Sequence, residues 1–394
     1  MEHYFKIVFW FSRRVGGDKK LEAFTLQRAL FKLLGFYWWD RGSSVPLPDL
    51  FKIWIYPVLY PILLLVVSYL TIKAVTQMDI IDDYDYVRKV NGFVVSMTFI
   101  ASALKCFYLR FIGEDIRYLI QMTEDIGEVN TTNEPLAGAL RTCVNYLSLL
   151  FCNAGTWTLY YLITYQDVPF PTDYPWNQQY TLGWFIAFCL TFLCALFCAT
   201  IHTLVDTIYP MSVEVITIHI ERIRIHLSFI GSGKWSDQTR LYQAVETHVV
   251  LLRVHKQMKK CFGMLFVAQA VYTVLHACVL IFAVVNTNDV IAPLMSALPM
   301  LSAAYVQLFM YCYYGQKLNS QFNSLSFAMY DNAWYNCNPS TRKVLLLFGE
   351  ACKKQAYLEG FGTVRAALPT YLRSLQESIS YFLVLKTVTS EAER

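Results

Sequence analysis

The chain has 394 residues, of which 56% are hydrophobic and 16% are charged, and its mean hydropathy is +0.36. Soluble domains carry about 25% charged residues, so this composition excludes a disordered chain, a coiled coil and a soluble enzyme built on a nucleotide-binding sheet. The formal net charge of +4 is spread along the chain without a dense basic block, which argues against nucleic-acid binding. The composition predicts a membrane protein.

Seven segments are predicted to cross the membrane as helices, because about 20 apolar residues span a hydrocarbon core of about 30 Å. The seventh, about 361–385, is the most polar, since it carries Arg365, Arg373 and Glu377. The other six follow from hydropathy and are, in chain order, 53–72, 90–104, 142–166, 174–205, 261–288 and 290–316.

These spans predict an all-α, polytopic membrane protein with a helical cytosolic anchor domain. The fourth and fifth spans are joined by a connection that is expected to be helical and cytosolic. The predicted organisation is a cytosolic N-terminal segment (1–50), transmembrane helices one to four (51–208), the four-to-five connection (209–260), transmembrane helices five and six (261–316), an anchor helix region (317–360), transmembrane helix seven (361–388) and an extracellular tail (389–394).

The distribution of Lys and Arg predicts the orientation. Basic residues concentrate in 1–50, 209–260 and 317–360, whereas the loops at 167–180 and 286–292 contain none. Cytosolic loops are the ones enriched in basic residues, so the N-terminus is expected in the cytosol and, after seven spans, the C-terminus outside. Glycosylation at the sequon of Asn130, in a loop predicted to be cytosolic, would overturn this orientation.

No catalytic, metal or cofactor site is predicted. The sequence has no zinc-protease, calcium-loop, phosphate-loop or nucleophile-elbow motif. None of the eleven cysteines falls in a predicted outer loop, so no extracellular disulfide is expected. The pattern does not favour an enzyme.

Six short motifs are distributed along the chain: LGF (34–36), VPFPTDYPW (168–176), VDT (205–207), YCYYGQ (311–316), YDNAWY (330–335) and SYFLVL (380–385). In this order they resemble the motifs of the insect odorant receptors. The chain lacks the Gln-Phe pair that gustatory receptors carry after the position of Tyr381, and its four-to-five loop is short, as in a ligand-tuning subunit and unlike the shared co-receptor.

The resemblance implies an odorant-gated, non-selective cation channel that passes monovalent and divalent cations. In this family a tuning subunit and the odorant co-receptor form a heterotetramer around a central pore, in the plasma membrane of sensory dendrites. The last span of each subunit lines the pore. The cytosolic ends of spans four to seven form an anchor where subunits meet, which here includes Tyr330, Trp334 and Tyr335.

The last predicted span carries a mostly polar stripe closed by two valines. Charged groups inside a membrane face water or the bundle interior, and an apolar ring can gate a pore by dewetting. The alternative is that Arg373 and Glu377 pair with each other, four residues apart. The resemblance implies that Val384 sets the narrowest point. The stripe, within about 60° of Val384 on a helical wheel, comprises Arg373, Glu377, Ser380, Tyr381, Val384, Thr387 and Val388.

The resemblance also implies a ligand cavity in the outer half of the bundle, among spans two, three, four and six. A small volatile ligand is recognised mainly by burial against apolar groups. Trp157 and Tyr305 are favoured, because each combines a large ring with one polar group. The candidates by depth are Val94, Met97, Thr98, Leu150, Asn153, Trp157, Phe185, Phe188, Leu298, Ser302 and Tyr305.

Two other functions stay open as alternatives. A G-protein-coupled seven-helix chemoreceptor would need the N-terminus outside and usually an outer disulfide. A small-molecule transporter would often show internal repeats with broken helices, and the two halves of this sequence show no such repeat.

Overall fold

The computed structural model describes residues 24–34, 47–81, 83–126, 134–165, 170–176, 181–231, 237–287 and 291–392. Over these residues the chain is all-α, as predicted, apart from one pair of two-residue strands. The sequon at Asn130 and most of the predicted N-terminal segment lie outside the described part.

Helices account for most of the described chain. They are α2 (Thr25–Leu33), α3 (Leu47–Gln77), α4 (Asp83–Asp125), α5 (Glu134–Tyr165), α6 (Thr181–Ser228), α7 (Asp237–Val285), α8 (Ile291–Ala328), α9 (Pro339–Cys352) and α10 (Leu368–Ala392), with a 3-10 turn η2 (Trp334–Asn336) and strands β1 (Glu359–Gly360) and β2 (Val364–Arg365).

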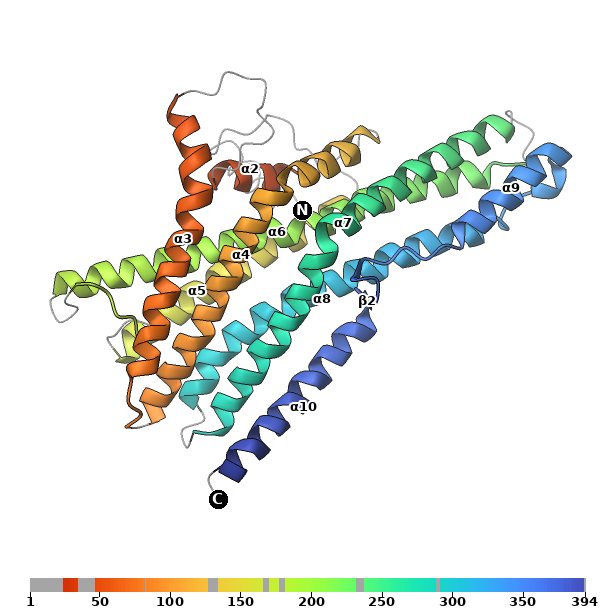
Figure 1. The fold of residues 1–394 in the computed structure, drawn as a ribbon. Helices are drawn as coiled ribbons and strands as arrows, with labels where there is room; N and C mark the ends of the chain where they lie inside the picture. Colours follow the sequence, from red (N-terminus) through yellow and green to blue (C-terminus); the bar gives the residue numbers. More distant parts are fainter. Residues whose placement is uncertain are drawn as a thin grey trace.

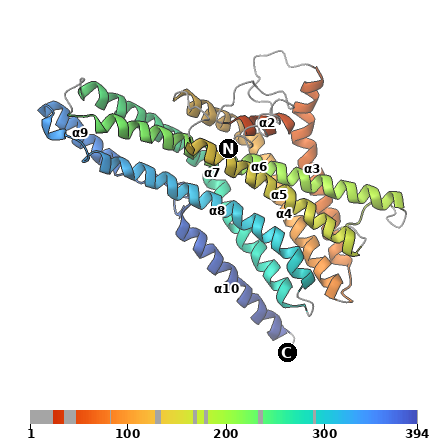
Figure 2. The same ribbon diagram turned by 180° about the vertical axis from the view of Figure 1, so that it is seen from behind.

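The helices form a bundle with an arm. Helices α3 to α8 pack together in the bundle, and α6, α7 and α8 continue beyond it to form the arm with α9 (Figure 1). Helix α10 contacts α7 and α8. The rest of α10 stands apart from the bundle, with the C-terminus at its free end, in both views (Figure 2).

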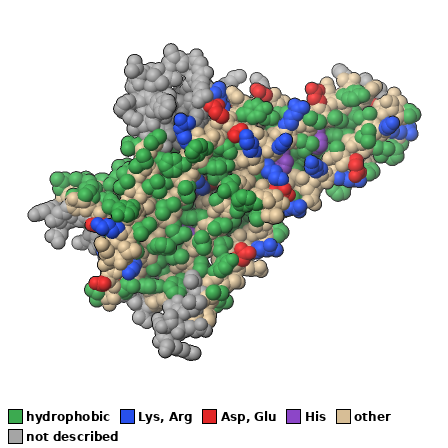
Figure 3. Space-filling model, viewed as in Figure 1, with side chains coloured by type: hydrophobic (Ala, Val, Ile, Leu, Met, Phe, Trp, Pro, Cys, Tyr) green, Lys and Arg blue, Asp and Glu red, His purple; other side chains and the backbone are tan. Residues whose placement is uncertain are grey.

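The protein is a multi-pass membrane protein. Over the described residues, four helices are long and apolar enough to cross a bilayer: Val58–Gln77, Asp85–Asp125, Thr181–Ser228 and Asp237–Val285. The last two have 48 and 49 residues, or about 70 Å at 1.5 Å per residue, so each extends well beyond a core of about 30 Å. Hydrophobic side chains cover much of the bundle face, and charged ones gather toward the arm (Figure 3).

Helix α6 forms the centre of the core. Every residue from 198 to 220 is buried, because α2, α4, α5, α7 and α8 all pack around this part of the helix. The largest hydrophobic cluster includes Ile201, Leu204, Val205 and Ile208 from α6. This packing fixes the position of the polar residues that α6 carries among them.

The β1–β2 hairpin fixes the start of α10 against the bundle. A Cβ added to Gly315 would lie 2.2 Å from the carbonyl oxygen of Ala366, and one added to Gly263 would lie 2.6 Å from that of Glu359. Only glycine allows these approaches. The hydrogen bond from Lys259 holds the pKa of the Glu359 carboxyl below its ordinary value. The segment predicted as span seven, about 361–385, thus falls on the hairpin and on α10.

Candidate functional site

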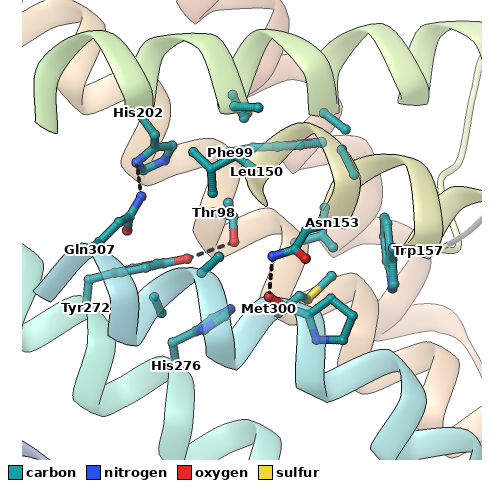
Figure 4. Close-up of a pocket in the computed structure, with 18 residues that line it drawn as sticks. Thr98, Phe99, Leu150, Asn153, Trp157, His202, Tyr272, His276, Met300 and Gln307 are labelled. Carbon is teal, nitrogen blue, oxygen red and sulfur yellow. Dashed lines mark hydrogen bonds between the residues drawn. The ribbon is translucent and has the colours of Figure 1, made fainter. Parts of the chain in front are cut away.

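A cavity of about 130 Å³ lies inside the bundle, between α4, α5, α6, α7 and α8. Most of its wall is apolar, formed by side chains such as Phe99, Leu150 and Met300. Polar groups enter this wall at a few positions only. They are Thr98, Asn153, Trp157, His202, Tyr272, His276 and Gln307 (Figure 4).

A loop residue supports one side of the cavity. Phe170 is buried, stacks on Trp157 with 5.7 Å between ring centroids, and meets Phe99 edge-on at 5.9 Å. The loop is held in place because the hydroxyl of Thr172 forms a 3.0 Å hydrogen bond with that of Thr71 on α3. Side-chain burial and this bond together fix the Trp157 ring in the cavity wall.

Three hydrogen bonds across the cavity wall join different helices. Thr98 of α4 and Tyr272 of α7 share one between hydroxyls 3.0 Å apart. The amide of Asn153 donates to the carbonyl of Pro299 on α8 at 2.8 Å. The amide of Gln307 lies 2.9 Å from Nδ1 of His202 (Figure 4). These groups are already paired, so they shape the cavity more than they attract a ligand.

Two polar side chains in the wall, those of Trp157 and His276, have no hydrogen-bond partner within the described part of the chain. The unpaired groups are the Nε1–H of Trp157 and both ring nitrogens of His276. Trp157 is 6% and His276 is 1% exposed, and they enter the cavity from α5 and α7 (Figure 4). A buried polar group without a partner costs free energy. A ligand with one polar group could satisfy either of them.

A buried ion pair adjoins the cavity at His202. Lys105 Nζ is 3.0 Å from both carboxylate oxygens of Asp206 and 2.8 Å from Nδ1 of His202. The hydroxyls of Tyr311 and Tyr146 donate to the same carboxylate at 3.0 and 3.3 Å. Because His202 also lines the cavity, this network connects the cavity wall to α4, α5, α6 and α8.

The structure brings four of the eleven predicted ligand residues together. Thr98, Leu150, Asn153 and Trp157 all line the cavity. Ser302 lies at its edge, where its hydroxyl donates to Pro299 O at 2.8 Å and lies 3.4 Å from the Asn153 amide.

The other six candidates lie away from this cavity. Val94 packs against Leu280, and Met97 is half-buried on the same helix. Phe188 stacks on Trp184. Tyr305 faces α10, where its hydroxyl donates to Ser378 at 2.9 Å. The remaining two, Phe185 and Leu298, are exposed.

Four of the polar cavity residues were not among the predicted ligand residues. These are Tyr272 and His276 of α7, His202 of α6 and Gln307 of α8. Helix α7 was not expected to contribute at all. The one available signal was the presence of histidines within apolar segments, which is a mark of function in membrane proteins.

Most of the predicted pore stripe is exposed on α10. Glu377, Ser380 and Thr387 are exposed, as are Tyr381 at 55% and Val384 at 59%. The Val388 side chain lies outside the described residues. Among described residues, no ion pair joins Arg373 to Glu377. The lining role of this stripe stays a prediction.

The predicted anchor residues lie beyond the end of α8, at the tip of the arm. Tyr330 is 71%, Trp334 44% and Tyr335 62% exposed. Large exposed aromatic groups close together are typical of an interaction surface. The role of these three residues in subunit contact stays a prediction.

Comparisons with known proteins agree with this architecture. A family model described as 7tm Odorant receptor matches residues 90–378. Odorant receptor 82a of Drosophila melanogaster is 22% identical over 225 residues, which cover 57% of this chain and 58% of that protein. Odorant receptor 85c of the same species is 22% identical over 308 residues, 72% of this chain and 78% of that one. The chain thus spans only about half to three quarters of these relatives.

Solved structures with the same fold come from the insect olfactory receptor OR5 of Machilis hrabei. One has a TM-score of 0.75 with 14% sequence identity, and the match covers 98% of both chains. A second, in complex with eugenol, has a TM-score of 0.74.

Proposed function

Since the chain belongs to the 7tm odorant receptor family, we propose that it is the odorant-binding subunit of a ligand-gated, non-selective cation channel. The observation that carries the proposal is the mostly apolar cavity inside the bundle, in whose wall two polar side chains have no hydrogen-bond partner among the described residues. The related receptor of Machilis hrabei has been solved in complex with eugenol, and we extend small-molecule binding to this chain.

The size of the cavity suits a single-ring ligand. Its volume is about 130 Å³, close to an engineered apolar cavity of about 150 Å³ that binds benzene. Burial against Phe99, Leu150 and Met300 would supply most of the binding free energy. The Nε1–H group of Trp157 would donate to an oxygen on the ligand, and the ring of His276 could accept from a hydroxyl. The preferred odorant is therefore a small ring with one oxygen function.

The proposed channel is a heterotetramer with the odorant co-receptor, in the plasma membrane. Each subunit has seven spans, which fall on α3 to α8 and α10, with the N-terminus cytosolic and the C-terminus outside. The exposed stripe of α10 that includes Ser380, Val384 and Thr387 would line the pore. Labelling of a C-terminal epitope on intact cells tests the orientation, and labelling only after permeabilisation would overturn it.

Helix α8 would transmit ligand binding to the pore. One of its faces lines the cavity through Met300, Ala303 and Gln307. Its other face meets α10, because the Tyr305 hydroxyl donates to Ser378 and the Tyr305 ring packs edge-on against Tyr371 at 6.2 Å. A ligand that binds better when α8 is displaced would favour the state in which α10 has moved with it.

Electrical recording tests the proposed function. The chain is expressed in cells with a co-receptor subunit, and a panel of single-ring odorants is applied. The current is measured with GTP omitted from the intracellular solution, so that G proteins cannot be activated. We expect a fast cation current. A response that requires a G protein would favour the chemoreceptor alternative, and substrate-coupled flux without channel current would favour a transporter.

A further inference from the structure

We propose that a phosphatidylethanolamine molecule of the surrounding bilayer binds in a second cavity of this chain, with its headgroup at the Glu214–Lys317 ion pair. This cavity has a volume of about 570 Å³ and lies between α5, α6 and α8. It is separate from the odorant cavity: the residues that line the two do not overlap.

The polarity of the second cavity changes along the helices. Its walls carry Thr142 on α5 and Lys317 on α8 at one end, and Leu149 and Val306 toward the other. Thr142 is the first residue of the apolar segment 142–166, and Lys317 directly follows the segment 290–316. The polar end is therefore at headgroup depth, and the apolar end is at acyl-chain depth. This grading matches a phospholipid.

The ion pair at the polar end leaves one acceptor unused. Lys317 Nζ donates to Oε1 of Glu214, whereas Oε2 has no hydrogen-bond partner within the described chain. The Glu214 side chain is 4% exposed and that of Lys317 is 26% exposed. A buried carboxylate oxygen without a donor is costly, so a rotation of the Glu214 side chain that brings Oε2 to an ammonium group in the cavity that this residue lines is favoured.

Charge complementarity selects the headgroup. An ethanolamine headgroup carries an ammonium with N–H donors for Glu214 Oε2 and, a few bonds away, a phosphate for Lys317. A choline headgroup has no N–H to donate. A serine headgroup adds a carboxylate that would lie close to Glu214 and be repelled. The pair thus favours ethanolamine over both.

The side of the cavity allows a lipid to enter from the bilayer. Phe309 and Tyr313 form its rim and are 41% and 44% exposed. One acyl chain could follow Phe309 toward Leu149 while the other stays in the bilayer. The inference rests on the membrane placement of α5 and α8 and is independent of odorant gating.

Lipid retention tests the proposal directly. The full chain is placed in nanodiscs with equal amounts of phosphatidylethanolamine, phosphatidylcholine and phosphatidylserine, extracted in mild detergent, and its bound lipids are counted by mass spectrometry. We expect phosphatidylethanolamine to be enriched about tenfold, the value of one hydrogen bond to a charged group, and Glu214→Gln to remove that enrichment. Equal retention of the three lipids, or an unchanged preference in Glu214→Gln, would overturn the proposal.

A pair of glycine variants keeps the test valid if Glu214→Gln folds poorly. Gly138 lines the cavity, and a Cβ added there meets no atom within 4 Å, so Gly138→Leu should fill the site without altering its charges. Gly155, on the same helix but outside this cavity, has equal space. We expect Gly138→Leu to lose the bound lipid and Gly155→Leu to keep it. Retention by both variants contradicts the proposal, whatever the odorant response is.

Discussion

Trp157 is the residue on which odorant selectivity should depend most. Its ring is fixed by Phe170 and its Nε1–H group has no partner in the described chain. We expect Trp157→Phe to keep the apolar wall and to raise the half-maximal concentration of oxygen-bearing odorants about fivefold, the value of one neutral hydrogen bond. Dose–response currents measure this change.

The control for this prediction is Trp184→Phe. The Nε1–H group of Trp184 also has no hydrogen-bond partner among the described residues, but Trp184 stacks on Phe188 and does not line the cavity. The odorant dose–response of Trp184→Phe should match that of the unsubstituted protein. If Trp157→Phe raised the half-maximal concentration equally for ring hydrocarbons and for oxygen-bearing odorants, Trp157 would act by packing only.

The ion pair of Lys105 and Asp206 should contribute to stability only as a pair. Asp206→Asn leaves a buried ammonium group without its counter-ion, which typically costs about 3–5 kcal/mol. We expect a large fall in the melting temperature in detergent. The double change Lys105→Met with Asp206→Leu should recover much of that loss, because no charge is then left buried.

Asp115→Asn provides the comparison for Asp206→Asn. The Asp115–Lys260 pair is largely exposed, with side-chain exposures of 33% and 61%, and such pairs contribute about 0–1 kcal/mol. Comparable falls in melting temperature for Asp115→Asn and Asp206→Asn would show that burial does not determine how much the Lys105–Asp206 pair contributes to stability.

Only some of the predicted ligand residues line the cavity, and the reason is physical. Depth along a span predicted Thr98, Leu150, Asn153 and Trp157, which do share a cavity. Depth does not give the direction of a side chain around the helix axis. Tyr305 has suitable depth, but the packing of α8 turns it toward Ser378 of α10.

At the scale of elements, hydropathy predicted the positions of the helices better than their ends. Apolar windows mark where α6 and α7 cross the membrane, but both continue as helices well beyond those windows, because the arm gives their ends further partners. The hairpin before α10 has no local signal. It depends on Gly263 and Gly315, which are distant in sequence.

The α8–α10 contact yields a prediction about coupling. Tyr305→Phe removes the hydrogen bond to Ser378 and keeps the ring contact with Tyr371. We expect a smaller maximal odorant-evoked current at unchanged surface expression. Ser378→Ala removes the same bond from the other side, so the double variant should behave like either single variant. Additive losses would mean that the two residues act separately.

At the scale of the whole molecule, α10 leaves a large part of its surface uncovered by the rest of the described chain. Its buried residues face α7 and α8, among them Ser374 and Ser378, whereas Ile379, Leu383 and Val384 are between 54% and 59% exposed. In a membrane span, exposed apolar groups of this kind are covered by lipid or by another protein chain. The sequence predicted the polar stripe, whereas the surroundings of each face of α10 depend on contacts outside the chain, which its own residue pattern does not encode.

The pore assignment therefore leads to a prediction about the assembled channel. If Val384 forms the narrowest ring, Val384→Ala widens it and lowers the cost of wetting the pore, so we expect a larger resting cation current and opening at lower odorant concentration. Ile379→Ala removes apolar volume from an equally exposed position on the opposite arc of α10 and should leave the resting current unaltered. Whole-cell currents, compared at matched surface expression with the co-receptor, distinguish the two. Unchanged resting and evoked currents in Val384→Ala would place the constriction elsewhere along the channel.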